Sequence, residues 1–153
     1  MAGIDANAFR LRDGTVVDHL PVGSAPRALA LLGLPRDGTV TVGMNVPSTR
    51  HGHKDIIRVE GLVLKKAELD RLALLGAQVT VSIVRGGAVT QKQVLEVPRR
   101  IEGVLTCPNP TCITRAEPVR TVFHRVGDFP HRFRCQHCER VLSAEQAQRS
   151  LVG

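Results

Sequence analysis

Hydrophobic and polar residues alternate with a period of two in several stretches of the first hundred residues. Four such stretches are residues 14–20, 38–46, 55–61 and 78–84. Alternation of this kind predicts strands that bury one face. In the second stretch we expect four apolar residues on one face, namely Val40, Val42, Met44 and Val46.

Two stretches between these strands have a helical period instead. They are residues 24–34, in which Ser24 is expected to be the N-cap and Gly33 the C-cap, and residues 65–76. The order strand, helix, strand, strand, helix, strand predicts an α+β domain of the ferredoxin-like βαββαβ type. Such a domain has a four-stranded antiparallel sheet with both helices on one face.

The pattern changes near Pro98, which lies in the connector "EVPRRIEG". Beyond it, residues 119–126 and 131–135 predict two antiparallel strands joined by a turn in "GDFP". We therefore expect two domains, residues 1–98 and residues 99–153. The second is a small antiparallel β domain with little core of its own, so its folding is expected to need support.

All four cysteines lie in this second domain, as C-x4-C, 22 further residues, and C-x2-C. They are Cys107, Cys112, Cys135 and Cys138. Two short loops that each supply a pair of soft ligands are typical of a structural, tetrahedral zinc site. The spacing therefore predicts one structural Zn²⁺ in a zinc-ribbon-like domain, with metal binding and folding coupled.

Two disulfides are the alternative use of four cysteines. The N-terminal stretch "MAGIDANAFRLRDG" has no apolar signal region and no stretch is long enough to span a bilayer, so we expect a soluble, cytoplasmic protein. Thiols stay reduced there, which argues against disulfides. A redox role for Cys135 and Cys138 would leave the first pair unexplained.

The histidines near these motifs are interpreted as structural or surface residues. His137 lies between two predicted ligands, but four thiolates already complete the coordination sphere. A closed site has no position for a catalytic water, which argues against a zinc enzyme. His51 and His53 have no third ligand nearby and are interpreted as part of a flexible polar loop.

Composition favours an anionic partner. The formal net charge is +7, and residues 1–98 hold 12 Lys/Arg against 9 Asp/Glu while residues 99–153 hold 9 against 5. A zinc-containing RNA-binding module is the alternative function that fits a basic chain. Recognition of single-stranded RNA on a sheet needs aromatic residues for base stacking. Aromatic residues make up only 3% of the chain and the central strands contain none, which argues against RNA binding. A mild basic excess also suits small anionic ligands such as nucleotides, or an acidic protein partner.

One set of polar residues could hold such an anion. Lys54 and Arg58 are four apart in a predicted strand and therefore point to the same side. Asp18 lies on another strand beside His19, and Lys92 follows the last predicted strand. Two or three cations near a carboxylate could hold a triphosphate and orient its nucleoside. The alternative is a solvated charged face, and no P-loop or G-x-G-x-x-G is present.

Longer motifs resemble those of a known family, the regulatory chain of aspartate carbamoyltransferase (aspartate transcarbamoylase). The resembling segments are "GTVVDHL", "TVGMNVPS" with "GHKDIIRVE", "VPRRIEGVLTCPNPTCITRAEPV" and "FRCQHC". The resemblance runs from about residue 9 to the end of the chain with few gaps.

The resemblance implies a non-catalytic regulatory subunit in de novo pyrimidine biosynthesis. In this family the N-terminal domain binds ATP as activator and CTP, with UTP, as inhibitors. The zinc domain contacts the catalytic chains, and three regulatory homodimers join two catalytic trimers into a dodecamer. The four cysteines match the zinc ligands. The positions that match nucleotide contacts are Leu11, Val16, Asp18, His19, Lys54, Val84, Val89 and Lys92.

Three features depart from the family pattern. Arg58, which we also assign to the nucleotide site, stands where lysine is frequent, and a planar guanidinium differs from an ammonium in its geometry. Gly87 stands where an aromatic residue can pack near the base, and residues 8–10 differ from the usual N-terminal segment. We therefore expect the ranking or strength of the nucleotide response to differ, with zinc binding and assembly retained.

Overall fold

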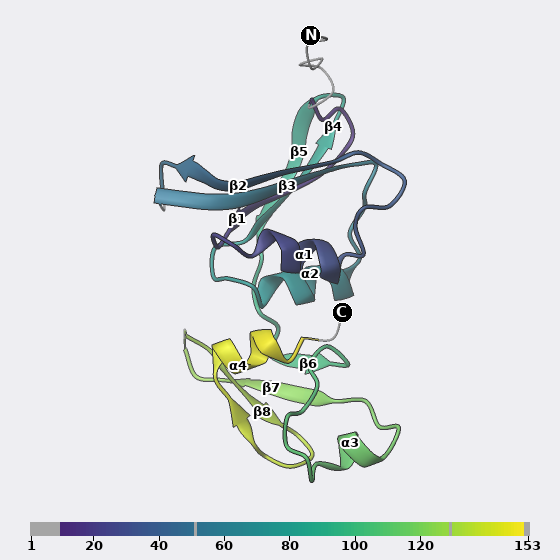
Figure 1. The fold of residues 1–153 in the computed structure, drawn as a ribbon, viewed down its shortest axis with the longest axis vertical. Coiled ribbons are helices and arrows are strands. Elements are labelled where there is room, and N and C mark those ends of the chain that lie inside the picture. The colour runs from purple at the N-terminus through teal and green to yellow at the C-terminus, as the bar shows by residue number, and fades with distance from the viewer. Residues whose placement is uncertain (1–9, 51, 129, 152–153) are drawn as a thin grey trace.

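The computed structural model describes residues 10–50, 52–128 and 130–151. The N-terminal unit comprises β1 (Gly14–Leu20), α1 (Ala25–Leu31), β2 (Val40–Ser48), β3 (Gly52–Glu60), α2 (Lys66–Ala73), β4 (Thr80–Arg85) and β5 (Ala88–Val94). Its strands form one antiparallel sheet in the order β2-β3-β1-β4-β5. Both helices lie on the same side of this sheet (Figure 1). The predicted α+β class is thereby confirmed.

The sheet has five strands, one more than predicted. The additional strand, β5, pairs with β4 through a two-residue turn at Gly86 and Gly87, whose φ angles are 58° and 79°. Positive φ at both central residues is the geometry that glycine allows in tight hairpins. Every residue of β5 is exposed, so it lacks the buried apolar face by which a strand is recognised from sequence. Lys92, expected beyond the last strand, therefore lies within β5.

The core of the N-terminal unit lies between the sheet and the two helices. Alternate strand residues such as Val17, Ile57 and Val81 are buried against helix residues such as Ala28 and Leu72. Burying these side chains removes apolar area from water, which is the main favourable contribution to folding. The opposite face of the sheet carries no helix in Figure 1 and is therefore available for a ligand.

Two β-bulges interrupt the alternation opposite β3. The register of β1 slips between Val17 and Leu20, and that of β2 slips between Gly43 and Val46. A bulge residue in each strand has positive φ: His19 at 56° and Asn45 at 55°. The extra residue reverses the faces beyond it. Val46 consequently pairs opposite Lys54, so the prediction that it shares a face with Val40 and Val42 is wrong.

A buried carboxylate holds the bulge of β2 and the start of α1. Asp55 is fully buried, and its Oδ2 accepts hydrogen bonds from the backbone N–H of Gly23 and of Ala25, both at 3.0 Å. Its Oδ1 accepts one from Asn45 N–H at 2.9 Å. Ser24 occupies the N-cap position of α1, as predicted, but makes no capping hydrogen bond because its hydroxyl donates to Pro21 O at 2.6 Å. Asp55 caps the helix instead.

The C-terminal unit is a second, smaller antiparallel sheet with two short helices. Its elements are β6 (Arg100–Glu102), α3 (Ile113–Ala116), β7 (Val122–Val126), β8 (Arg132–Cys135), β9 (Val141–Leu142) and α4 (Ala144–Arg149). The strands pair in the order β6-β7-β8-β9. The predicted antiparallel pair is confirmed as β7 and β8. Its core comprises Phe123, Phe133 and Leu142 with three of the cysteines.

The helices of the N-terminal unit face the C-terminal unit, so the uncovered sheet face points away from it (Figure 1). Leu74, which follows α2, packs into the C-terminal core. Gln148 of α4 donates from Nε2 to Leu75 O at 3.3 Å, and its own carbonyl accepts a hydrogen bond from the Arg27 guanidinium of α1. The Arg125 guanidinium donates to Val97 O at 2.6 Å. These contacts join the two units.

Candidate functional site

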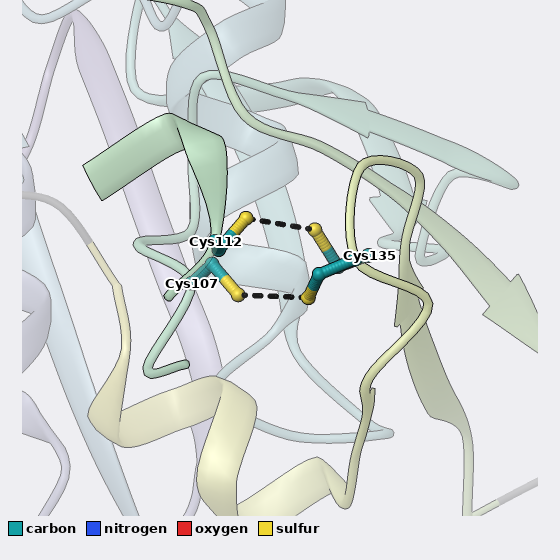
Figure 2. A group of neighbouring side chains, drawn as sticks. Cys107, Cys112 and Cys135 are labelled. Carbon is teal, nitrogen blue, oxygen red and sulfur yellow. Dashed lines mark hydrogen bonds between the residues drawn. The ribbon is translucent and has the colours of Figure 1, made fainter. Parts of the chain in front are cut away.

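The four cysteine sulfurs of the C-terminal unit converge on one point. All four Sγ atoms lie within 4.8 Å of one another, and all four residues are free thiols. Figure 2 shows Cys107 and Cys112 on one side and Cys135 opposite them. The Sγ atoms of Cys107 and Cys138 are 3.6 Å apart, and those of Cys112 and Cys135 are 3.8 Å apart.

These separations fit a metal ion better than disulfides. A disulfide has an S–S length of about 2.05 Å. Four sulfurs at about 2.3 Å from a central zinc ion form a tetrahedron with edges of about 3.8 Å. The two closest pairs each join one sulfur from the first loop with one from the second, as a shared ion requires. Four sulfur donors in this arrangement are typical of zinc or iron sites.

Local structure positions each pair of thiols. Asn109, between Pro108 and Pro110, accepts a hydrogen bond at its side-chain oxygen from Thr111 N–H at 3.1 Å, which closes the first loop as a tight turn. The second loop turns at Glu139, whose φ is 65° and whose N–H donates to Cys135 O at 2.8 Å. His137 lies within hydrogen-bonding distance of Arg120 O, with Nε2 at 3.3 Å.

Without a metal ion, the buried thiols favour the protonated form. Burial raises the pKa of Cys107 to about 12 and raises the pKa of Cys135. Burial acts in the same direction on Cys138, but hydrogen bonds from Asn109 and from the backbone of Arg140 outweigh it and lower its pKa to about 7. Thiolate is the form that binds a metal. A bound cation would therefore supply the charge that makes buried thiolates favourable at neutral pH.

The charged residues predicted for the nucleotide site lie on the uncovered face of the N-terminal sheet. Residues paired across antiparallel strands share a face. Arg58 of β3 pairs with Val16 of β1, Val16 pairs with Ser82 of β4, and Ser82 pairs with Lys92 of β5. These four residues form one row across four strands. Arg58 and Lys92 are the cations at its two ends, and the smaller side chains of Val16 and Ser82 lie between them.

An ion pair lies next to this row. Lys54 Nζ is 2.9 Å from Oδ1 and 3.1 Å from Oδ2 of Asp18. The partial burial of Asp18 would raise the pKa of its carboxyl group, but the hydrogen bonds from Lys54 and from His19 N–H lower it below the ordinary value. The carboxylate is thus fixed in its charged form. His19, in the bulge, has Nδ1 at 3.2 Å from Thr80 Oγ1.

The remaining predicted residues lie toward the β4–β5 turn. Val84 pairs with Val89 on the uncovered face, and Leu11 lies beside Gly86 and Gly87, where these residues line a cavity of about 500 Å³. Residues 8 and 9 and His51 lie outside the described part of the chain. His53, interpreted from sequence as part of a flexible loop, lies within β3 opposite Pro47.

A cavity of about 570 Å³ lies on the opposite, helix-covered face. It is lined by residues that include Leu64, Leu69, Ile83 and Gln91. Lys92 is the only one of the predicted nucleotide-site residues that lines it. Volume alone does not recognise an anion, and this cavity is not lined by the other charged residues predicted for the anion site, namely Asp18, Lys54 and Arg58.

Fold and site together define a class of protein: a ferredoxin-like domain with a charged open face, joined to a small domain that clusters four thiols for a metal. Residues 7–96 match the family model described as "Aspartate carbamoyltransferase regulatory chain, allosteric domain", and residues 99–148 match the corresponding "metal binding domain".

Relatives share this similarity over nearly their whole length. The chain is 43% identical over 148 residues to the aspartate carbamoyltransferase regulatory chain of Korarchaeum cryptofilum, covering 94% of each chain. It is 44% identical over 140 residues to that of Methanopyrus kandleri, covering 90% of each. It is 42% identical over 139 residues to that of Pyrococcus horikoshii, and the match covers 89% of this chain and 91% of the relative.

The chain belongs to the aspartate carbamoyltransferase regulatory chain family, with an allosteric and a metal-binding domain. Within the described residues, no helix is long and apolar enough to cross a membrane.

Proposed function

We propose that the chain is a non-catalytic regulatory subunit of aspartate carbamoyltransferase in pyrimidine biosynthesis. Residues 1–98 would form the domain that binds ATP as activator and CTP and UTP as inhibitors. Residues 99–153 would form the domain that holds Zn²⁺ and contacts the catalytic chains. The observation that carries the proposal is the gathering of Asp18, Lys54, Arg58 and Lys92 on one uncovered face, in a chain whose cysteines cluster at its other end.

The nucleotide proposal rests on the chemistry of this face. Lys54, Arg58 and Lys92 are cations that can neutralise a triphosphate. Asp18 is held as a carboxylate and can accept hydrogen bonds from a base or ribose hydroxyl. Leu11, Val16, Val84 and Val89 supply apolar contacts, and His19 adds a polar one. The pairing of Arg58, Val16, Ser82 and Lys92 across neighbouring strands supports one binding surface rather than scattered charges.

The zinc proposal rests on the donor set. Cys107, Cys112, Cys135 and Cys138 supply four soft ligands at separations that suit a tetrahedral ion. When bound, Zn²⁺ would supply charge compensation and fix the two loops. The four thiols would complete its coordination sphere, so the role of the ion would be structural.

Assembly requires two further surfaces. The edge strand β2 contains no charged residue and exposes Val42 and Met44, so it is suited to pair with β2 of a second copy. At the other end, Ile113 beside the first cysteine loop is exposed and suits contact with a catalytic chain. A homodimer with a zinc domain at each end would link two catalytic trimers, and three such dimers would complete the dodecamer.

Regulation then requires coupling between the two ends. A nucleotide shifts an equilibrium only if it binds the two quaternary states with different free energies. The contacts of Leu74, of Gln148 and of Arg125 provide physical continuity between the domains. A change in sheet geometry on binding would reach the zinc domain through α1 and α2.

Assembly is tested by mixing the metal-loaded chain with the catalytic trimer of the same organism and measuring the mass of the product by light scattering. We expect a complex much heavier than the trimer, lost after metal removal with a thiol-reactive mercurial and restored by Zn²⁺. A metal-loaded chain that leaves the trimer's mass unchanged would contradict the assembly proposal.

Nucleotide binding is tested separately by calorimetry with ATP, CTP and UTP. Lys54→Met should weaken binding at least tenfold, because it removes one triphosphate cation and unpairs Asp18. Lys66→Met is the matched control, since Lys66 forms its exposed ion pair with Asp70 on α2, away from this face. Equal weakening by both variants would show that overall charge, and not the proposed site, determines binding.

A further inference from the structure

The outer face of the C-terminal sheet carries a row of basic residues that the proposed zinc site does not use. Arg100 of β6 pairs with His124 of β7, and His124 pairs with Arg134 of β8. These three residues therefore stand side by side on one face, with Arg132 two positions before Arg134 on the same side. We call these four residues the basic row. Ile101, Phe123 and Phe133 point to the opposite face, into the core.

The charges of the basic row are poorly compensated within the chain. Arg100 lies 3.7 Å from Glu102, and both of these side chains are about half exposed. His124 is hydrogen-bonded through Nε2 to Gln136 Oε1 at 2.9 Å. Within residues 10–50, 52–128 and 130–151, no carboxylate lies within ion-pair distance of Arg132 or Arg134. Both of these arginines are exposed.

Like charges in neighbouring cross-strand positions destabilise a sheet. Strands are about 4.8 Å apart, so the backbone positions of Arg100 and Arg134, with His124 between them, lie about 10 Å apart. Such an arrangement becomes favourable when an anionic surface covers it. Arginine is also the cation best suited to carboxylates, because its planar fork makes two parallel hydrogen bonds.

We propose that the basic row is a docking surface for an acidic patch on the catalytic chains. This inference rests on the proposed function, and it adds the location and the charge of one contact. The row would accelerate encounter by electrostatic steering and orient the zinc domain on the trimer.

A nucleic acid is the other polyanion that such a row could attract. The described residues favour a protein surface. The two phenylalanines of β7 and β8, Phe123 and Phe133, are buried on the inner face, so neither can stack on a base at this face. Val126 and the exposed Val141 border the row and add apolar contacts that suit a protein interface.

The test uses the full, zinc-loaded chain and the intact catalytic trimer. Arg132→Gln/Arg134→Gln removes two charges from the row. The control Lys66→Gln/Arg149→Gln removes two charges from exposed helical ion pairs elsewhere. Metal content and thermal midpoint of all three proteins are measured first. Association rates are then followed by stopped-flow light scattering between about 20 and 300 mM salt, the range in which surface charges become screened.

We expect the row variant to associate about tenfold more slowly than wild type at low salt, with a weaker salt dependence, while the control stays within about twofold of wild type. Equal rates for wild type and both variants would overturn the inference and leave the proposed function intact. A wild-type chain that does not join the trimer would overturn the proposed function itself. Loss of retention on immobilised poly(U) by the row variant, with unchanged association with the trimer, would assign the row to nucleic acid and overturn the acidic-protein proposal.

Discussion

Asp55 is the residue whose substitution most directly tests how this fold is held together. Among the described residues it is the only fully buried acidic or basic side chain. Its carboxylate accepts three backbone hydrogen bonds, from the turn before α1, from α1 itself and from the β2 bulge. In Asp55→Asn, one of the two acceptor oxygens is replaced by an NH2 group. This group cannot accept a hydrogen bond, and it faces the backbone N–H donors that the oxygen had paired.

The magnitude follows from the number of donors left unpaired. A buried polar group without a partner costs about 1–3 kcal/mol, and hydrogen bonds to a charged acceptor are at the stronger end of the range. With Oδ1 replaced, Asn45 N–H loses its acceptor; with Oδ2 replaced, Gly23 and Ala25 lose theirs. We expect Asp55→Asn to lower the free energy of unfolding by about 3 kcal/mol. For a unit of this size that corresponds to about 12–24 °C in Tm.

The assay is thermal and urea unfolding of the metal-loaded chain, followed by circular dichroism, with amide hydrogen exchange at Gly23, Ala25 and Asn45. Asp37→Asn is the matched control, because Asp37 is an exposed acid and its substitution should shift Tm by less than about 2 °C. If Asp55→Asn melts like the control while the three amides keep their protection, the reasoning about the buried carboxylate is refuted.

Three other substitutions or conditions have definite expected outcomes. Metal binding must expel thiol protons, and those of the buried Cys107 and Cys135, whose pKa values are raised, set a minimum of two. Apparent zinc affinity should therefore fall at least about 100-fold for each unit that pH drops below 8, measured by chelator competition; a pH-independent affinity would contradict this. Below pH 7 the proton of Cys138, with a pKa of about 7, should steepen the fall further. Lys54→Met should raise the pKa of the Asp18 carboxyl group toward its ordinary value, measured by carbon-detected NMR titration, because Lys54 is the principal interaction that lowers it. Leu74→Ala should destabilise the chain by about 2–3 kcal/mol by leaving a cavity at the junction of the two units, measured by urea unfolding with the exposed Val63→Ala as control.

The sequence predicted most of the N-terminal fold because its buried strands alternate clearly. Val17, Ile57 and Val81 give the period-two signal, and all three are buried in the structure. The strand β5 could not be found in this way, since "AVTQKQV" has no buried face. The signal that identifies it is the Gly86–Gly87 dipeptide between two residues of extended conformation, because two adjacent positive φ angles are the mark of a tight hairpin.

Long-range interactions explain the other differences. Ser24 holds the N-cap position, but a carboxylate thirty-one positions later accepts the capping hydrogen bond, and nothing local in the sequence indicates it. The bulge of β2 is held by the same carboxylate, and β1 has a bulge of its own, so the faces of Val46 and His19 could not be assigned from alternation alone. The cysteine cluster, in contrast, was predictable because the ligand spacing is itself a geometric requirement.

The position of Leu74 has a consequence for how regulation would depend on the metal. Leu72 and Leu75 belong to the N-terminal core, whereas Leu74 between them belongs to the C-terminal core. A movement of α2 would therefore displace side chains in the cores of both units. The C-terminal core that receives Leu74 also contains Cys107, Cys112 and Cys135, so its rigidity would depend on the ion that joins their loops. Partial metal loss should consequently reduce the nucleotide response of the assembled enzyme before it dissociates the complex. The nucleotide response and the mass of the complex are measured together while metal is removed stepwise. If both are lost at the same metal content, the core around Leu74 does not need the ion to transmit the change.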